Sequence, residues 1–175
     1  MDPYFELKGN KVIASPHTAG PWDPTMQHGG APTGLMTHIA EQIPSDHPML
    51  ITRLTVDMKR PIPLGELEVK TDITRKGRNI IAADISLISD EKEVCRAAIL
   101  KVREKPFDMP EDVKPPTIVY PKSDNQHEVV RFKGFNDGVT IFEAQNAPAH
   151  MRRAAWFHIA RPWFGDQDTT PSMRA

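Results

Sequence analysis

Four apolar, strand-like runs follow one another in the first part of the chain with only short connections between them. The runs cover residues 51–59, 66–74, 79–89 and 93–102. Alternation with period two predicts that one face of the second run carries Leu67, Val69, Thr71 and Ile73, and that one face of the third carries Ile81, Ala83, Ile85 and Leu87. Two of the connections are centred on Pro61–Gly65 and on Gly77. A parallel crossover needs a dozen or more residues, whereas antiparallel neighbours can be joined by a few. The spacing therefore predicts a single antiparallel sheet.

An amphipathic helix is expected before this sheet. Its apolar residues recur with the spacing of a helix that has one buried face, and they are Leu35, Met36, Ile39, Ala40 and Ile43. Pro32 suits the first helical position, where a missing N–H costs nothing, and Pro44 ends the pattern. Two short strand-like runs, 4–7 and 11–14, flank Gly9-Asn10 and predict an N-terminal hairpin.

A sheet with one apolar face and one helix of matching length bury each other best when the sheet wraps around the helix. The predicted class is therefore α+β with a hotdog fold, in which an antiparallel sheet surrounds a central helix. We expect residues 1–103 to form one complete hotdog domain of this kind.

The rest of the chain predicts a linker and the start of a second unit. Residues 104–127 contain five prolines and little periodicity, which is typical of an inter-domain linker. Residues 138–145 and 154–162 then have strand patterns, and Pro171–Ala175 has the pattern of a first helical turn. Because this order repeats the opening of the first domain, we expect residues 128–175 to begin a second hotdog that is incomplete at the end of the chain.

Charge and composition exclude several classes of function. The formal net charge is -1, from 22 basic and 23 acidic residues. The chain therefore lacks the excess of basic residues that would indicate binding to nucleic acid. The single Cys95 allows neither an internal disulfide nor a paired-cysteine zinc cluster, and no metal site or cofactor is expected. The N-terminus lacks the pattern of a signal peptide, and no apolar run has the length of a membrane span. We therefore expect a cytoplasmic protein without membrane contact.

The loop before the helix is the candidate site. Gln27, His28, Gly29 and Gly30 lead directly into Pro32. A helix N-terminus presents unpaired N–H groups and a positive dipole end, which can hold a carbonyl oxygen that gains negative charge. The two glycines let a ligand approach the backbone closely. This arrangement suits acyl-transfer chemistry.

With these segments the chain resembles the double-hotdog acyl-CoA thioesterases of the TesB-like type, in the thioesterase-like superfamily. The resemblance is carried by Gly20–Trp22, Gln27–Gly30, Leu54–Gly65, Arg75–Arg78 and Ala155–Pro162. It implies a hydrolase of fatty acid metabolism that converts an acyl-CoA thioester to free acid and CoA, with CoA as part of the substrate and not as a cofactor. It also implies that the catalytic Asp, Thr or Ser, and Gln come largely from the second repeat.

The resemblance places the thioester carbonyl near the N–H groups of Gly29 and Gly30. The acyl chain is then expected along Leu35, Met36 and Ile39, which together with the two glycines form the predicted substrate-binding set.

Gln27 and His28 are the candidate catalytic residues. Each has an equally simple structural interpretation, since a histidine before two glycines can orient the turn and a loop glutamine can be an ordinary polar residue.

The loop also departs from its relatives. Met26 and Thr37 stand where single-hotdog thioesterases of the phenylacetate-pathway kind carry an Asn and an acidic residue. This loop is therefore not a complete catalytic site by itself. Because the acid and the Gln that the resemblance implies for the second repeat would lie beyond Ala175, we expect weak or no hydrolysis by this chain alone. The alternative is a non-catalytic acyl-CoA-binding or assembly subunit, which forms a homo-oligomer or pairs with a second hotdog, because an incomplete repeat leaves strand edges exposed.

A hotdog enoyl-CoA hydratase is the third interpretation. Asp23 and His28 have the spacing of the acid and histidine in the hydratase loop, but Thr25 and Met26 replace its Asn and Pro.

Overall fold

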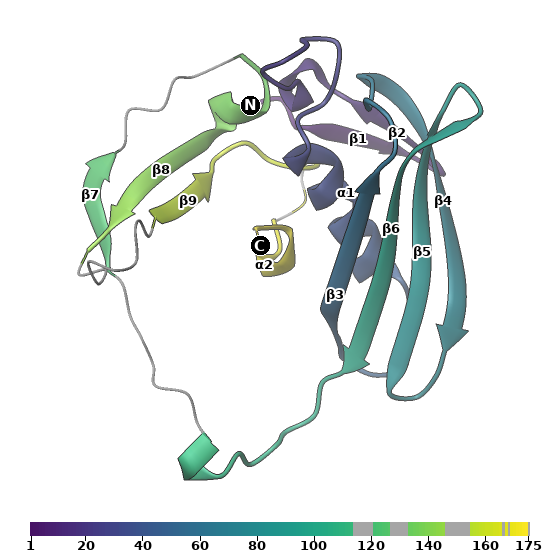
Figure 1. The fold of residues 1–175 in the computed structure, drawn as a ribbon, viewed down its shortest axis with the longest axis vertical. Helices are drawn as coiled ribbons and strands as arrows, with labels where there is room; N and C mark the ends of the chain where they lie inside the picture. Colours follow the sequence, from purple (N-terminus) through teal and green to yellow (C-terminus); the bar gives the residue numbers. More distant parts are fainter. Residues whose placement is uncertain (114–120, 127–132, 146–154, 166, 168, 175) are drawn as a thin grey trace.

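The computed structural model describes residues 1–113, 121–126, 133–145, 155–165, 167 and 169–174. Its main body is a six-stranded sheet packed against one long helix, α1 (Gly30–Gln42), which Figure 1 shows lying along one side of the strands. The strands are β1 (Phe5–Lys8), β2 (Lys11–Ala14), β3 (Met49–Met58), β4 (Gly65–Lys76), β5 (Ile80–Ser89) and β6 (Lys92–Arg103). All strand pairs are antiparallel in the order β1-β2-β4-β5-β6-β3, which confirms the predicted α+β class with a sheet around a helix.

The apolar faces of the strands agree with the predicted pattern on β5, and only in part on β4. On β5, Ile81, Ala83, Ile85 and Leu87 are buried, as the alternation predicts. On β4, Leu67 is buried, but Thr71 and Ile73 are exposed. The later half of β4 lies beyond the part that pairs with β2, so it is an edge of the sheet and its side chains remain exposed. Met58, at the end of β3, is half exposed and lies beside Gly29, where both residues line the same cavity.

A second, smaller sheet follows, with β7 (Lys122–Gln126), β8 (Val139–Ala144) and β9 (Ala155–Ile159) in that order. Strand β7 lies inside the range 104–127 for which the sequence predicts a linker. The sequence of β7 has no β-branched or aromatic residue, so its amino acids do not by themselves favour a strand. The strand forms because it pairs with β8. Residues 114–120 and 127 of that range, and residues 128–132 and 146–154 of the expected second repeat, lie outside the described residues.

The C-terminal segment packs against the first sheet. The N–H groups of Tyr4 and Phe5 donate to the carbonyl oxygens of Pro162 (3.0 Å) and Trp163 (2.9 Å). Residues around Phe164 therefore run parallel to β1 and form a bridge with Phe5. Helix α2 (Pro171–Arg174) then contacts α1, as Figure 1 also shows. The turn predicted at the end of the chain is present, and it covers the side of α1 that faces away from the sheet.

Helix α2 is tied to α1 by a polar contact as well. The hydroxyl of Thr170 donates to the Glu41 carboxylate (2.8 Å) and accepts from the N–H of Met173 (3.3 Å).

None of the helices in the described part of the chain has the length and apolar composition that crossing a lipid bilayer requires.

A lysine holds the C-terminal end of α1. Lys101 is on the β6 face that packs on the helix, and it is only 4% exposed. Its Nζ donates to the carbonyl oxygens of Ala40 (2.9 Å), Glu41 (3.3 Å) and Ile43 (3.1 Å). The last carbonyls of a helix lack partners within it, and a cation also suits the negative end of the helix dipole. Burial lowers the pKa of Lys101, while the negative charge of Glu41 acts in the opposite direction.

Replacement of this lysine by methionine tests how much the cap contributes. Lys101→Met keeps the length of the side chain but removes the donor of the Glu41 and Ile43 carbonyls and leaves the Ala40 carbonyl with only the N–H of Ile43, so we expect the free energy of unfolding to fall by about 2–3 kcal/mol. Chemical denaturation measures the change. Lys70→Met, at an exposed position of β4, is the matched control and should change stability by less than about 0.5 kcal/mol. Equal effects of the two substitutions would contradict the capping role.

Candidate functional site

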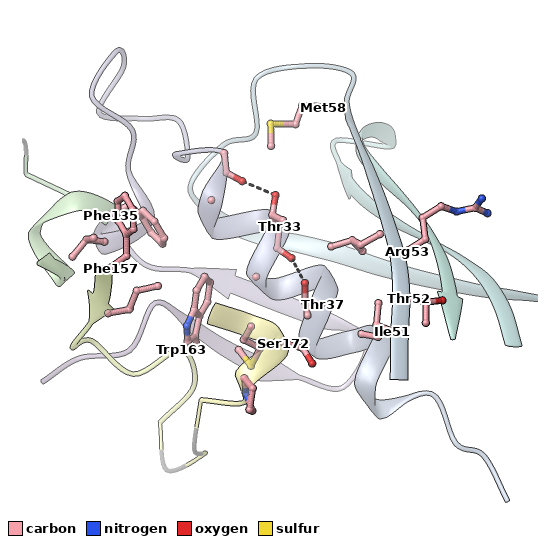
Figure 2. Close-up of a pocket in the computed structure, with 18 residues that line it drawn as sticks. Thr33, Thr37, Ile51, Thr52, Arg53, Met58, Phe135, Phe157, Trp163 and Ser172 are labelled. Carbon is pink, nitrogen blue, oxygen red and sulfur yellow. Dashed lines mark hydrogen bonds between the residues drawn. The ribbon is translucent and has the colours of Figure 1, made fainter. Parts of the chain in front are cut away.

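A cavity of about 940 Å³ lies between the first half of α1, strand β3 and the C-terminal part of the chain (Figure 2). This volume is typical of small-molecule sites. Helix α1 and the residue before it contribute Gly29, Gly30, Thr33, Gly34 and Thr37. Strand β3 contributes Ile51, Thr52, Arg53, Leu54 and Met58. The remaining wall comes from Phe135, Val139, Phe157, Ile159, Trp163, Pro171, Ser172 and Met173.

The polar groups of this wall are mostly neutral. The hydroxyls of Thr33 and Thr37 donate to the carbonyl oxygens of Gly29 and Thr33, each at 2.9 Å, so that their lone pairs are left to accept. Figure 2 shows these two side chains one above the other on the helix, while the guanidinium of Arg53 points away from it. Within the described residues, no carboxylate or imidazole lines the cavity.

The helix N-terminus has fewer free amides than the sequence suggests. The N–H of Gly30 donates to Nδ1 of His28 (3.1 Å), and the N–H of Ala31 donates to the His28 carbonyl (2.9 Å). Pro32 has no N–H. The N–H of Gly29 has no hydrogen-bond partner in the described part of the chain, and Gly29 lines the cavity. One amide of this turn, and not a pair, is therefore available to a ligand.

His28 orients the turn before the helix. Its ring stacks on Phe135 with centroids 4.9 Å apart and planes 9° apart, and its backbone N–H donates to the Thr18 carbonyl (2.7 Å). Burial lowers the pKa of His28, which favours the neutral ring that Nδ1 needs in order to accept from Gly30. His28 is absent from the cavity lining, so its catalytic role stays a prediction.

Gln27 is held by the loop between β3 and β4. Its N–H donates to the Ile62 carbonyl (2.7 Å), and its side-chain Nε2 donates to the Pro63 carbonyl (2.8 Å). Its Oε1 is buried with no hydrogen-bond partner among the residues that the structure describes. Like His28, Gln27 does not line the cavity.

The predicted acyl path differs from the observed cavity. Leu35 and Met36 are fully buried in the core, where Sδ of Met36 lies 3.9 Å from Sγ of Cys95, and Ile39 packs against the same core. These residues point to the sheet, whereas the cavity is on the neighbouring face of the helix that Thr33 and Thr37 occupy. The predicted residues Gly29 and Gly30 do line it.

The aromatic wall comes from residues that the sequence did not single out as site residues. Phe135, Phe157 and Trp163 lie far from the helix in the chain, and the fold brings them to it. The one available signal is Gly34, since a glycine inside a helical pattern often marks a close packing contact.

Asp23 takes part in a turn. Its carboxylate accepts from the N–H (2.8 Å) and the hydroxyl (2.6 Å) of Thr25, and these hydrogen bonds lower its pKa. It is exposed and does not line the cavity. Neither Asp23 nor His28, the pair that the hydratase interpretation needs, lines the cavity. His, Cys, Asp and Glu residues of the described ranges also form no group of three that could hold a metal ion.

Comparison with solved structures defines the class of the fold. A conserved protein of unknown function with a hot dog fold from Alicyclobacillus acidocaldarius superposes with a TM-score of 0.56 at 14% identity, over 82% of this chain and 53% of that chain. A "putative thioesterase" from Novosphingobium aromaticivorans DSM 12444 gives a TM-score of 0.64 at 17% identity, over 91% and 66%. The chain thus spans about half to two thirds of the length of these structures. The protein has a hotdog fold.

The family comparison is more specific. Residues 18–102 match the family model described as the acyl-CoA thioesterase N-terminal domain, which supports the thioesterase-like superfamily. The protein smu.793 from Streptococcus mutans UA159, solved bound to acetyl CoA, has a TM-score of 0.50 at 15% identity, over 57% of this chain and 88% of that chain. No curated protein matches the sequence.

The buried histidine predicts a pH dependence of stability. Because the pKa of His28 is lowered in the folded protein, the unfolded chain binds the proton more readily, and the stability present above pH 6.5 is lost as the pH falls toward the lower folded-state value. His38, buried against Phe164, has a pKa shifted in the same direction. His28→Asn keeps an acceptor for Gly30 without titrating, so we expect a shallower decline than in the wild type.

Urea denaturation of both proteins between pH 7.5 and 5.5 measures this difference in slope. An identical slope in the wild type and His28→Asn would show that His28 is not a buried, neutral ring.

Proposed function

We propose that this chain provides the N-terminal hotdog of a TesB-like double-hotdog acyl-CoA thioesterase, and that the cavity binds the acyl thioester. The observation that carries the proposal is that the cavity lies largely within the part of the chain that matches the family model. The matched residues 18–102 contain both the helix and the β3 walls of the cavity. The acetyl CoA bound by smu.793 supports an acyl-CoA ligand for this fold.

The cavity is suited to both parts of such a ligand. Its apolar and aromatic wall would shield an acyl chain from water, and burial of each methylene stabilises the complex by about 0.8 kcal/mol. The thioester carbonyl would lie at the N-terminus of α1, where the free N–H of Gly29 can donate to an oxygen that becomes negative as water attacks.

Hydrolysis needs one further group. Water attacks the carbonyl carbon, CoA leaves as the thiolate, and a base must take the proton of the water. The described lining offers hydroxyls and the Arg53 side chain but no base. We propose that a second hotdog supplies it, and that the 175-residue chain by itself binds acyl-CoA but hydrolyses it slowly.

The second candidate is a non-catalytic acyl-CoA-binding subunit, which the same lack of a base favours. In either case, β3 offers a place for a second hotdog to pair. Among the described strands it pairs only with β6, so one edge of its ten residues is open.

Two measurements on the purified protein test the proposal. Thermal unfolding with acyl-CoAs of increasing length should show stabilisation, by about 2.7 kcal/mol at a concentration one hundred times the Kd. Release of free thiol from the same compounds measures hydrolysis. Binding with slow hydrolysis is the expected result. Fast hydrolysis would contradict the claim that this chain lacks the catalytic base. The absence of binding at every chain length would reject the proposed function.

A substitution at the cavity mouth locates the binding site. Phe157 lines the cavity and is 66% exposed, so Phe157→Asp should remove apolar contact without disturbing the core, and weaken acyl-CoA binding about tenfold. Phe107→Asp is the matched control, because Phe107 is even more exposed and is absent from the lining. Titration of both variants with one acyl-CoA gives the comparison, and equal affinities would place the ligand elsewhere.

A further inference from the structure

Trp163 packs directly on the backbone of helix α1 at Gly34. A Cβ atom built on Gly34 would lie 2.1 Å from Cη2, 2.3 Å from Cζ3 and 2.8 Å from Cζ2 of the indole. Real Cβ contacts are essentially never this short, so any side chain at position 34 would displace the ring. The six-membered edge of the indole therefore occupies the space that a side chain of α1 would otherwise fill.

The indole is held rigidly in this position. It is only 2% exposed, and its backbone carbonyl accepts from the N–H of Phe5 (2.9 Å). The rings of Tyr4 and Phe135 lie 5.2 and 5.9 Å from it, and Phe5 stacks at 6.4 Å with an interplanar angle of 10°. Nε1 is buried with no acceptor in the described part of the chain, so shape and not a hydrogen bond holds the ring.

The ring also forms one boundary of the cavity. Figure 2 shows Trp163 between α1 on one side and Phe135 and Phe157 on the other, with Ser172 beside it. Tyr4 and Phe5, which pack on the indole, are core residues and do not line the cavity. The indole thus separates the cavity from the core beneath β1.

We propose that Trp163 limits the length of acyl chain that the cavity accepts, by closing the cavity against Gly34. The inference rests on the proposed function, since it assigns the selectivity of that same site. A smaller side chain at position 163 opens space between α1 and β1, and the end of a longer chain can fill it because close packing there removes apolar carbon from water.

The test is a series of acyl-CoAs of increasing length, bound to the wild type and to Trp163→Leu. We expect the wild type to show a maximum in affinity and Trp163→Leu to shift it to chains about two carbons longer, with about a fourfold gain for each added methylene that the new space accepts. Trp163→Phe keeps an aromatic ring in the core and should give a smaller shift in the same direction if Trp163→Leu does not fold.

Phe164→Leu is the matched control. Phe164 is the next residue, is also buried at 4% exposure and packs on His38, yet it does not line the cavity. This variant should lose stability without any change in the preferred length.

The contact with Gly34 is tested independently by Gly34→Ala. In the wild type the added methyl meets the indole, so we expect a loss of stability, whereas in the Trp163→Phe background the same change should cost much less.

The outcomes separate the two claims. A shift of the preferred acyl length in Trp163→Leu or Trp163→Phe, without such a shift in Phe164→Leu, supports the inference. An unchanged length preference in the Trp163 variants, or the same shift in Phe164→Leu, overturns it while leaving acyl-CoA binding in place. The absence of acyl-CoA binding by the wild type overturns the proposed function and this inference with it.

Discussion

Helix α1 is buried on two sides, and the positions of the sheet, the cavity and the C-terminal segment all depend on this double burial. Leu35, Met36 and Ala40 pack into the sheet. On the other side, Gly34 receives the indole of Trp163 and α2 packs beside it. The cavity lies between these two layers, along the helix from Gly29 to Thr37. A change on either side therefore alters the shape of the site.

The two ends of α1 are held by side chains from other elements and from the preceding loop. At the C-terminal end the ammonium of Lys101 donates to three carbonyls, and at the N-terminal end Nδ1 of His28 accepts from Gly30. The second contact has a chemical consequence. By using an amide of the first turn for structure, His28 leaves the N–H of Gly29 as the donor for a ligand. The most conspicuous residue of the loop thus positions the helix, and the less conspicuous glycine faces the cavity.

The sheet could be predicted because its signals are local. Alternation with period two on β5, short connections and the stripe of α1 are each contained in a dozen residues, and all appear in the structure. The errors share one physical cause, which is dependence on a partner distant in the chain. Strand β7 has no intrinsic preference and forms by pairing with β8. Thr71 and Ile73 on β4 are exposed because the part of β4 beyond its pairing with β2 is an edge of the sheet.

The amino-acid sequence by itself determined the hotdog architecture, the place of the helix and the loop that leads into it at residues 27–30, because periodicity, proline and glycine act through local geometry. Only the tertiary structure decided which face of the helix is available to a ligand. The apolar stripe that indicated an acyl path packs against the sheet, and the cavity is lined by Thr33, Thr37 and Trp163 instead. Burial of apolar side chains is the dominant favourable term in folding, so the residues with the clearest apolar pattern were the least available for binding.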